Sequence, residues 1–432
     1  MSRHGGVPTP LYRLYCGLTA ALGPLAWWTI RRKLVQAGVS PERRQERLGH
    51  PSLTRAPGPL IWFHAASVGE SLSVLTLITR MARRLPQHSF LITSGTPTSA
   101  RLIAKRLPPR SCHQFAPIDA AGPLRRFYAH WRPQAGLFVE SELWPRMIVE
   151  GRRRGLALAL INARLSDGSV RKWRRFPKTA GFLLEQFDLF LTQNRKSADN
   201  LLAMGADPAR VQPGTNLKAL SDPLPVDEVA LARIRRDIGA RPVWVASSTH
   251  PGEEAVVLDA HKRLLADHPE LLLILVPRHP ERGPEVAAMI EQAGLTGACR
   301  SAGEAVTEAT QVFMADTLGE TGTWYALCPL VFMGGSLERI GGHNPFEPAQ
   351  AGAAVLTGPG FFNFAETYAA LIAGGGAVEV NSAAELHRAV NRWLTDDAAF
   401  AAARQAASQS VAEGQAALDA VVETLCKRLG LD

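Results

Sequence analysis

Short apolar runs alternate with longer amphipathic stretches along most of the chain after Pro59. Apolar runs predict strands at 60–64, 89–93, 136–140, 156–162 and 187–193. Between them, stretches such as 70–85 and 143–154 carry apolar residues every three or four positions, which predicts helices. Because strands that alternate with helices build parallel sheets, the pattern predicts a parallel α/β domain.

The alternation breaks at 211–225, which contains three prolines and a glycine, and then resumes. Further strands are predicted at 243–246, 271–276, 312–315, 330–333, 354–356 and 377–380. An alanine-rich helix is predicted over 397–429. We therefore expect a Rossmann-like domain over 34–215, a linker over 216–225 and a second Rossmann-like domain over 226–432, whose last helix is free to pack back on the first domain.

The first 33 residues form a separate segment. Leu14 to Ile30 is a run without charge, flanked by Arg13 and by the basic cluster of Arg31, Arg32 and Lys33. As a helix it would be about 25 Å long, near the lower limit for crossing a bilayer. We expect a hydrophobic membrane anchor, and a helix lying in the membrane interface is the alternative. A cleaved signal peptide fits less well, because the run ends in basic residues.

Composition and charge narrow the choice further. With 46% hydrophobic and 20% charged residues, the 432-residue chain is of the globular type. Its five cysteines are at least 29 positions apart, which excludes a CxxC metal site and favours a reducing compartment. Residues 1–215 carry 32 Lys and Arg against 12 Asp and Glu, whereas the remainder carries 16 against 27. The basic half predicts an anionic partner, and a merely solvated basic face is the alternative.

The usual phosphate-loop, dinucleotide, serine-hydrolase and zincin motifs are missing from the sequence. Acidic residues instead follow the predicted strands of the first half. Glu70 begins a helix after the first strand, where it either accepts a proton from a substrate hydroxyl or only complements the helix dipole. Glu140 and Glu142 follow another strand, where either one carboxylate faces the cleft and the other caps the next helix, or both cap that helix. Arg164 follows the next strand and is either an anion ligand or a surface residue.

The second half carries hydroxyl-rich and glycine-rich loops after its strands. Ser247-Ser248-Thr249 precedes a helix, which suits a phosphate or an ordinary cap. Arg278 follows the next strand. The stretch 334–349 is dense in glycine and contains Glu347, whose carboxylate could accept hydrogen bonds from ribose hydroxyls.

These motifs, read in order, resemble the Kdo (3-deoxy-D-manno-octulosonic acid) transferase family. The resemblance covers nearly the whole chain through RRQERLG, HAASVGE, ESELWPRMI, NARLS, TNLK, SSTHPGEE, VPRHPER, TLGE and GGHNPFEPA. It implies an α/β fold of the GT-B type, with two Rossmann-like domains facing a central cleft. It also implies an inverting transferase without metal or cofactor, which moves Kdo from CMP-Kdo to the lipid A precursor, a tetraacyldisaccharide bisphosphate, in lipopolysaccharide core biosynthesis. The implied location is the cytoplasmic face of the bacterial inner membrane, with its anionic leaflet.

The resemblance also implies roles for single residues. Glu70 matches the general base. Glu140 and Lys218 match transition-state stabilisers, and Glu142 and Arg164 match positions that bind or support the acceptor. The positions that match donor contacts are Ser247, Ser248, Thr249, Arg278, His279, Gly319, Glu320, Gly334, Gly335, Ser336, Asn344 and Glu347. One motif departs from the family: 166–169 reads SDGS where Ser-x-Arg-Ser is expected, so the contact of that second arginine stays open.

Two other functions stay open at this point. One is another GT-B sugar-nucleotide enzyme, either a transferase with a different donor or an epimerase. The other is a basic module that binds nucleic acid, although this leaves the apolar run at 14–30 unexplained. We expect no nucleic-acid partner.

Overall fold

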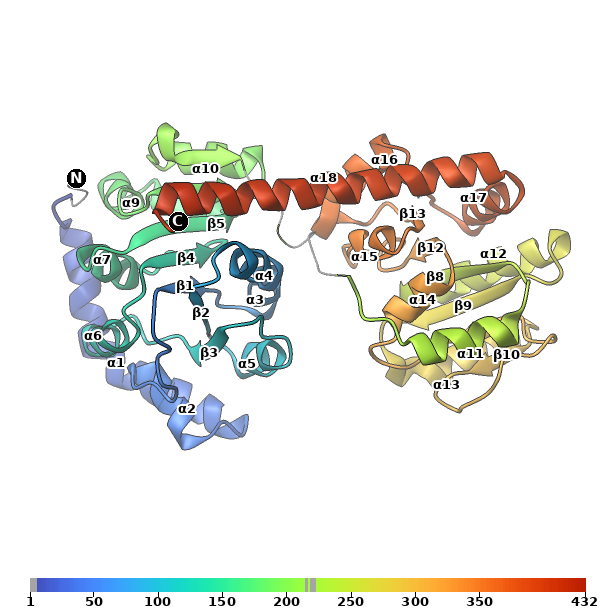
Figure 1. Ribbon diagram of the computed structural model, residues 1–432, viewed down its shortest axis with the longest axis horizontal. Helices are drawn as coiled ribbons and strands as arrows, with labels where there is room; N and C mark the ends of the chain where they lie inside the picture. The colour runs from blue at the N-terminus through green and yellow to red at the C-terminus, as the bar shows by residue number, and fades with distance from the viewer. Residues whose placement is uncertain (1–5, 214–216, 218–222) are drawn as a thin grey trace. The chain divides into compact units, whose positions relative to one another are not determined.

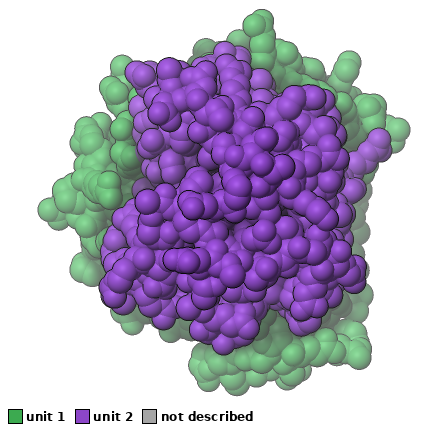
Figure 2. Space-filling model, turned by 90° about the vertical axis from the view of Figure 1, so that its right-hand side faces the viewer, with its two compact units in different colours: residues 1–220, 416–432 green, residues 221–415 purple. Residues whose placement is uncertain are grey.

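The computed structural model describes residues 6–213, 217 and 223–432, and the chain forms two compact units. Unit 1 contains residues 1–220 and 416–432, and unit 2 contains residues 221–415 (Figure 2). Each unit is built on its own seven-stranded sheet, in which every recorded strand pair is parallel. The predicted α/β class with two parallel sheets is therefore confirmed.

The sheet of unit 1 has the strand order β3-β2-β1-β4-β5-β6-β7 (Figure 1). Its strands are β1 (Leu60–His64), β2 (Ser89–Ser94), β3 (Ser111–Phe115), β4 (Ala135–Val139), β5 (Ala157–Ala163), β6 (Leu189–Thr192) and β7 (Val211–Pro213). Its helices are α1 (Pro10–Gln36), α2 (Pro41–Gln45), α3 (Val68–Ser73), α4 (Leu75–Arg84), α5 (Pro97–Ala104), α6 (Ala121–Trp131), α7 (Pro145–Arg153), α8 (Asp167–Trp173), α9 (Pro177–Leu184) and α10 (Arg195–Ala203).

Helices cover both faces of this sheet because alternate strand residues point to opposite sides. Ile61 and Phe63 pack with α4 on one face, while Leu60 and Trp62 pack with α6 on the other. The end of the last helix joins the first face, where Leu418 and Leu425 are fully buried. This is why residues 416–432 belong to unit 1.

The sheet of unit 2 has the order β10-β11-β9-β8-β12-β13-β14. Its strands are β8 (Val243–Thr249), β9 (Leu272–Pro277), β10 (Gly297–Cys299), β11 (Val312–Met314), β12 (Leu330–Met333), β13 (Ala354–Thr357) and β14 (Ala377–Glu379). Its helices are α11 (Glu228–Ile238), α12 (Glu253–Asp267), α13 (Gly283–Gln292), α14 (Thr321–Leu327), α15 (Phe346–Gln350), α16 (Ala365–Ala373) and α17 (Ala383–Thr395). α18 (Asp397–Leu429) begins in unit 2 and ends in unit 1.

The predicted break in the strand–helix alternation at 211–225 was wrong for residues 211–213. Val211–Pro213 forms β7, which pairs with β6 at the edge of the sheet. A proline at a strand end is tolerated there because an edge strand has one side without a neighbour. The hydrophobic pattern also missed β3 and β10.

The predicted N-terminal helix is present as α1, which begins at Pro10 after the N-cap Thr9. Five of its large side chains, Leu14, Leu18, Leu22, Leu25 and Trp28, are between 50% and 61% exposed. Their spacing of three and four places them along one face of the helix. Among the described residues, no helix combines the length and apolarity needed to cross a membrane. The predicted membrane anchor stays a prediction.

Candidate functional site

Three glutamates of unit 1 lie together at the point where the strand order of its sheet reverses. The chain runs from β1 outward to β2 and β3 and then returns to β4, which pairs with β1 on its other side. The loops after β1 and β4 diverge at this point, and such crevices are where parallel α/β sheets bind ligands. Glu70 lies in the first turn of α3 after β1, and Glu140 and Glu142 follow β4.

Glu70 closes a cap at the start of its helix. Its Oε2 accepts the Ala66 N–H at 2.9 Å and its Oε1 accepts the Ser67 hydroxyl at 2.7 Å, while its own N–H donates to the Ser67 oxygen at 3.3 Å. Burial raises the pKa of Glu70, and the negative charges of Glu142 and Glu140 raise it further against these hydrogen bonds. The residue is thus a helix cap whose charged form is disfavoured by burial and by the two neighbouring carboxylates.

The pKa of Glu142 is shifted in the opposite direction. Burial alone would raise its pKa, but contacts from His64 and Trp144 outweigh burial and lower it. Trp144 Nε1 donates to Oε2 at 2.5 Å, and His64 Nε2 lies 3.4 Å from the same oxygen. Two neighbouring carboxylates with pKa values shifted in opposite directions are typical of acid–base sites.

Glu140 lies directly after β4 with a φ of 57°, the left-handed region that non-glycine residues seldom adopt. Its N–H donates to the carbonyl of Ile161, and its carbonyl accepts the N–H of Arg164 at 3.4 Å. Arg164 therefore lies beside Glu140 through the backbone, with an exposed side chain. Strained backbone of this kind often occurs at functional sites.

One residue of this edge was missed as a candidate. Asn162 also has a positive φ, of 50°, and lies where the pairing of β5 with β6 shifts register. Its Oδ1 accepts the N–H of Leu217, and its buried Nδ2 has no hydrogen-bond partner in the described part of the chain. Leu217 precedes Lys218 in the sequence, and Lys218 itself lies outside the described residues. Asn162 belongs to the NARLS motif, but nothing in that motif distinguishes Asn162 from Arg164 as a candidate site residue.

The predicted donor residues of unit 2 gather at the corresponding edge of the second sheet, where β8 lies between β9 and β12. The N–H of Arg278 donates to the Thr249 carbonyl, and the N–H of Gly334 donates to the Ser247 carbonyl. A Cβ on Gly334 would lie 2.6 Å from the Ser248 carbonyl oxygen, so only glycine fits. Ser248 has a φ of 56° and lies at a register shift between β8 and β9.

Glu253, in the first turn of α12, organises the two loops at this edge. Its fully buried carboxylate accepts the backbone N–H groups of His250, Gly335, Ser336 and Leu337 at 2.6–3.0 Å. The N–H groups of Gly335 and Ser336 are therefore already donated. The glycine-rich loop therefore contributes a shape that lets its backbone approach a ligand closely. The sequence could not separate Glu253 from an ordinary first-turn glutamate.

Some predicted donor residues point into the interior of unit 2. Ser247 Oγ contacts the Tyr325 hydroxyl at 2.8 Å, and Ser336 Oγ donates to the Met333 carbonyl at 2.6 Å. The Thr249 hydroxyl is also buried, with no hydrogen-bond partner in the described part of the chain. Of these three hydroxyls, Thr249 is therefore the best placed to change partner when a ligand binds.

Three histidines lie close together beside Arg278. His250 Nε2 lies 3.0 Å from His343 Nε2, and the ring centroid of His279 lies 5.7 Å from that of His250. Burial, reinforced by neighbouring positive charge, lowers the pKa of His343 to about 4. Burial also lowers the pKa of His250. Of the three, only His279 was a candidate.

The remaining donor candidates lie just before α14, just before α15 and in the first turn of α15. Gly319 adopts a φ of 87° just before Glu320, whose carboxylate forms a bidentate pair with Arg300 at 2.6 and 3.1 Å. Asn344 Oδ1 accepts the Phe346 N–H at the start of α15. A cavity of about 210 Å³ lies beside Glu347, and its lining residues are Pro223, Leu224, Val226, Gly322, Tyr325, Ala326, Glu347, Gln350 and Ala351.

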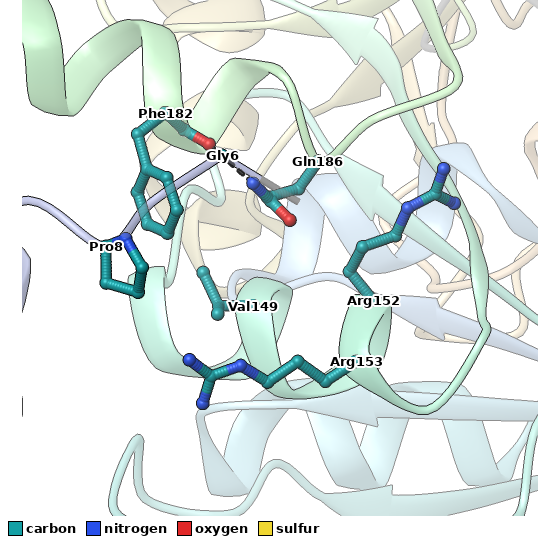
Figure 3. A pocket seen from close by; sticks show the side chains of 7 residues that line it. All are labelled: Gly6, Pro8, Val149, Arg152, Arg153, Phe182 and Gln186. Carbon is teal, nitrogen blue, oxygen red and sulfur yellow. Dashed lines mark hydrogen bonds between the residues drawn. The ribbon is translucent and has the colours of Figure 1, made fainter. Parts of the chain in front are cut away.

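A cavity of about 220 Å³ in unit 1 lies apart from the predicted site residues (Figure 3). It is lined by Gly6, Pro8, Val149, Arg152, Arg153, Phe182 and Gln186. Arg152 forms a bidentate pair with Asp188, and Gln186 donates to the Phe182 carbonyl. Within residues 6–213, 217 and 223–432, no three His, Cys, Asp or Glu side chains are grouped so that they could hold a metal ion.

Residues 42–221 match the family model described as 3-Deoxy-D-manno-octulosonic-acid transferase (kdotransferase). A probable mitochondrial 3-deoxy-D-manno-octulosonic acid transferase of Arabidopsis thaliana is 34% identical over 395 residues, which cover 89% of this chain and 88% of that protein. The 3-deoxy-D-manno-octulosonic acid transferase of Haemophilus influenzae is 32% identical over 420 residues, covering 95% and 97%.

The crystal structure of a glycosyltransferase from Rickettsia africae superposes with a TM-score of 0.57. The match covers 87% of this chain and 99% of that one at 11% sequence identity. At this identity the likeness concerns the fold alone, which is of the GT-B type.

Proposed function

Because this chain belongs to the 3-deoxy-D-manno-octulosonic acid transferase family and is a glycosyltransferase, we propose that it moves Kdo from CMP-Kdo to the lipid A precursor, a tetraacyldisaccharide bisphosphate. In this reaction a hydroxyl oxygen of the acceptor attacks the anomeric carbon of Kdo. The bond from that carbon to the phosphate oxygen breaks, and CMP leaves. A single displacement inverts the anomeric centre.

Glu70 is the proposed general base, and the gathering of Glu70, Glu140 and Glu142 at the β1/β4 edge is the observation that carries this proposal. A base must take the hydroxyl proton as the new bond forms, and its strength grows with its pKa. The raised pKa of Glu70 makes its carboxylate a stronger base than that of an ordinary exposed glutamate. The hydrogen bonds from Ala66 and Ser67 hold this carboxylate in place.

Unit 2 is proposed to bind the nucleotide and to stabilise the leaving phosphate. The exposed Arg278 and the neighbouring His279 can face an anion, and the Thr249 hydroxyl can donate to it. Glu347, beside its cavity, is proposed for the ribose hydroxyls. Preorganised donors of this kind stabilise developing charge without moving during the reaction.

α1 is proposed to lie in the interface of an anionic membrane, at the cytoplasmic face of the bacterial inner membrane. Its exposed face of Leu14, Leu18, Leu22, Leu25 and Trp28 supplies apolar contact, and the basic cluster at 31–33 follows on the same helix. The excess of positive charge in residues 1–215 suits both an anionic leaflet and a bisphosphorylated acceptor.

The membrane proposal is tested by co-sedimentation with vesicles of phosphatidylglycerol and phosphatidylcholine. Leu18→Glu with Leu22→Glu should abolish binding to the anionic vesicles. Val229→Glu is the matched control, because Val229 is 82% exposed on α11 in unit 2 and should bind as wild type does. Equal binding of all three proteins would contradict the proposal.

The transfer is tested by mass spectrometry of the products formed from purified full-length protein and the tetraacylated precursor. With CMP-Kdo we expect products heavier by whole Kdo units, and the masses count the additions. UDP-sugars offered in place of CMP-Kdo should give none. Product from a UDP-sugar, or epimerisation of that sugar, would favour another GT-B enzyme, and salt-dependent binding of nucleic acid without transfer would favour a binding module.

A further inference from the structure

A row of buried polar side chains leads from the core of unit 1 to Glu142. Trp62 and His64 lie on β1, and Thr93 lies opposite His64 on β2. Trp62 Nε1 donates to Thr93 Oγ1 at 2.8 Å, and His64 Nδ1 lies 3.0 Å from the same oxygen. The other ring nitrogen, Nε2, lies 3.4 Å from Glu142 Oε2. The His64 side chain is only 3% exposed, so water does not compete freely for these atoms.

Counting donors leaves two arrangements of the protons in this row. Trp62 can only donate, so the single hydroxyl proton of Thr93 goes either to His64 Nδ1 or to the Phe63 carbonyl, 3.3 Å away. If it goes to Nδ1, the neutral ring carries its proton on Nε2. If it goes to Phe63, then Nδ1 donates to Thr93, and the neutral ring carries no proton on Nε2. Only in the first arrangement does a neutral His64 present a proton from Nε2 to Glu142. The carboxylate of Glu142 favours this arrangement, because it attracts an N–H and repels a ring lone pair.

The contact between Nε2 and Glu142 is long for a hydrogen bond, so its main effect is electrostatic and directional. Trp144 Nε1 donates to the same oxygen at 2.5 Å. Trp144 Nε1 and His64 Nε2 therefore both lie against Oε2. Oε1 accepts no side-chain hydrogen bond from the residues that the structure describes, and the Glu142 side chain is 13% exposed. A ligand hydroxyl can reach an oxygen of this kind.

We propose that His64 is a positioning residue that holds Oε2 of Glu142, so that Oε1 is presented to a hydroxyl of the acceptor sugar next to the attacking one. The inference deepens the proposed function and rests on it for the identity of the acceptor. Glu142 touches the substrate, and His64 acts only through Glu142. The histidine of the HAASVGE motif thereby gains a role that is distinct from that of Glu70.

Two substitutions of His64 separate this role from a merely structural one. In His64→Gln the amide nitrogen can occupy the place of Nε2 and donate to Glu142. In His64→Asn the shorter amide can occupy the place of Nδ1 and keep the contact with Thr93. We expect His64→Gln to keep kcat/KM for the lipid acceptor within about fivefold of wild type, and His64→Asn to lose at least about fiftyfold.

A structural role predicts the reverse order, because it depends on satisfying Thr93 in the core. Equal activities, or a more active His64→Asn, would overturn the inference, provided that both variants unfold at temperatures near that of wild type. If neither folds, the double-mutant cycle is made with His64→Phe. With Glu142 already replaced by Gln, the His64 change should cost no more than about twofold. A full additional loss would also overturn the inference.

A spectroscopic measurement keeps this test separate from that of the proposed function. Protein with ¹⁵N-labelled histidine should show a protonated Nε2 for His64 at neutral pH, and Glu142→Gln should shift that signal. The control variant Glu385→Gln, far along the chain on α17, should leave it unchanged. An unprotonated Nε2 would overturn the positioning role even if the wild type transfers Kdo. Conversely, a protein that transfers no Kdo yet shows this signal would contradict only the proposed function.

Discussion

Two helices of this protein begin with the same four-residue cap, Ser-x-x-Glu, but their glutamates differ in pKa. In unit 1, Ser67 and Glu70 form the cap of α3, and in unit 2, Ser382 and Glu385 form the cap of α17. In both, the glutamate N–H donates to the serine oxygen at 3.3 Å, and the carboxylate accepts the N–H of the residue four positions before it, at 2.9 and 2.8 Å. The arrangement is a variant of the capping box, in which the carboxylate accepts the N–H of the residue before the N-cap serine.

The surroundings of the two carboxylates differ. Hydrogen bonds from the backbone and side chain of Asn381 lower the pKa of the exposed Glu385. Burial, with the charges of Glu142 and Glu140, raises the pKa of Glu70. The shared backbone capping contacts thus accompany opposite shifts, and burial, together with the charges of Glu142 and Glu140, makes the difference. A capping glutamate therefore becomes a candidate base when its tertiary surroundings raise its pKa.

The largest expected effect is on activity. Glu70→Gln keeps an acceptor oxygen for the cap but cannot take a proton, so we expect kcat to fall by about 10²–10⁴-fold. Glu385→Gln makes the same chemical change in the same cap and should stay within about twofold of wild type. Both are measured as Kdo transfer to the lipid precursor. Similar activities of the two variants would remove Glu70 from the chemistry.

A third glutamate in a first helical turn, Glu253, extends the comparison to stability. Glu253→Gln replaces one acceptor oxygen by an NH₂ group, which leaves buried N–H groups facing a donor. We expect the free energy of unfolding to fall by about 2–4 kcal/mol, since each unsatisfied buried group costs about 1–3 kcal/mol. Urea unfolding followed by circular dichroism measures this loss. A change as small as that of Glu385→Gln would mean that the loops relax around the amide.

The pH dependence of transfer tests the electrostatic cause directly. A general base must be ionised, so activity falls as the pH drops through the pKa of Glu70. Glu142→Gln removes a neighbouring negative charge and should lower that pKa, which moves the acidic limb of the kcat/KM profile to lower pH. Glu385→Gln should leave the limb in place. A shift to higher pH would contradict the assignment of the limb to Glu70.

The smallest expected effect is on thermal stability, and it has opposite signs in the two caps. The pKa of Glu70 is raised on folding, so the folded state binds more protons than the unfolded state between the two values, and the charged form opposes folding above them. Glu70→Gln should raise the melting temperature at pH 7 by about 1–2 °C. The pKa of Glu385 is lowered on folding, so its charge stabilises the folded state at pH values above the pKa of the unfolded state. Glu385→Gln should therefore lower the melting temperature at pH 7. Calorimetry at pH 7 and pH 4 checks both, and the differences should shrink at pH 4.

The hydrophobic pattern predicted most of the strands because buried parallel strands are continuous apolar runs. It missed β3, whose His113 and Gln114 are polar but buried. His113 Nε2 lies 2.9 Å from Ser94 Oγ, and Gln114 Oε1 accepts from Trp131 at 2.8 Å. Both partners are distant in the sequence. β7 and β10 are three-residue strands whose sequences, VQP and GAC, contain no run of large apolar residues.

The sequence by itself determined the α/β rhythm, the positions of the motifs and the local cap of Glu70, because these depend on residues within a few positions of one another. The tertiary structure decided that the loop after β4 lies beside the loop after β1, that Glu253 gathers four N–H groups, and that His64 meets Glu142. These outcomes depend on strand order and on partners far apart in the chain, which sheet packing selects and no short stretch of residues encodes.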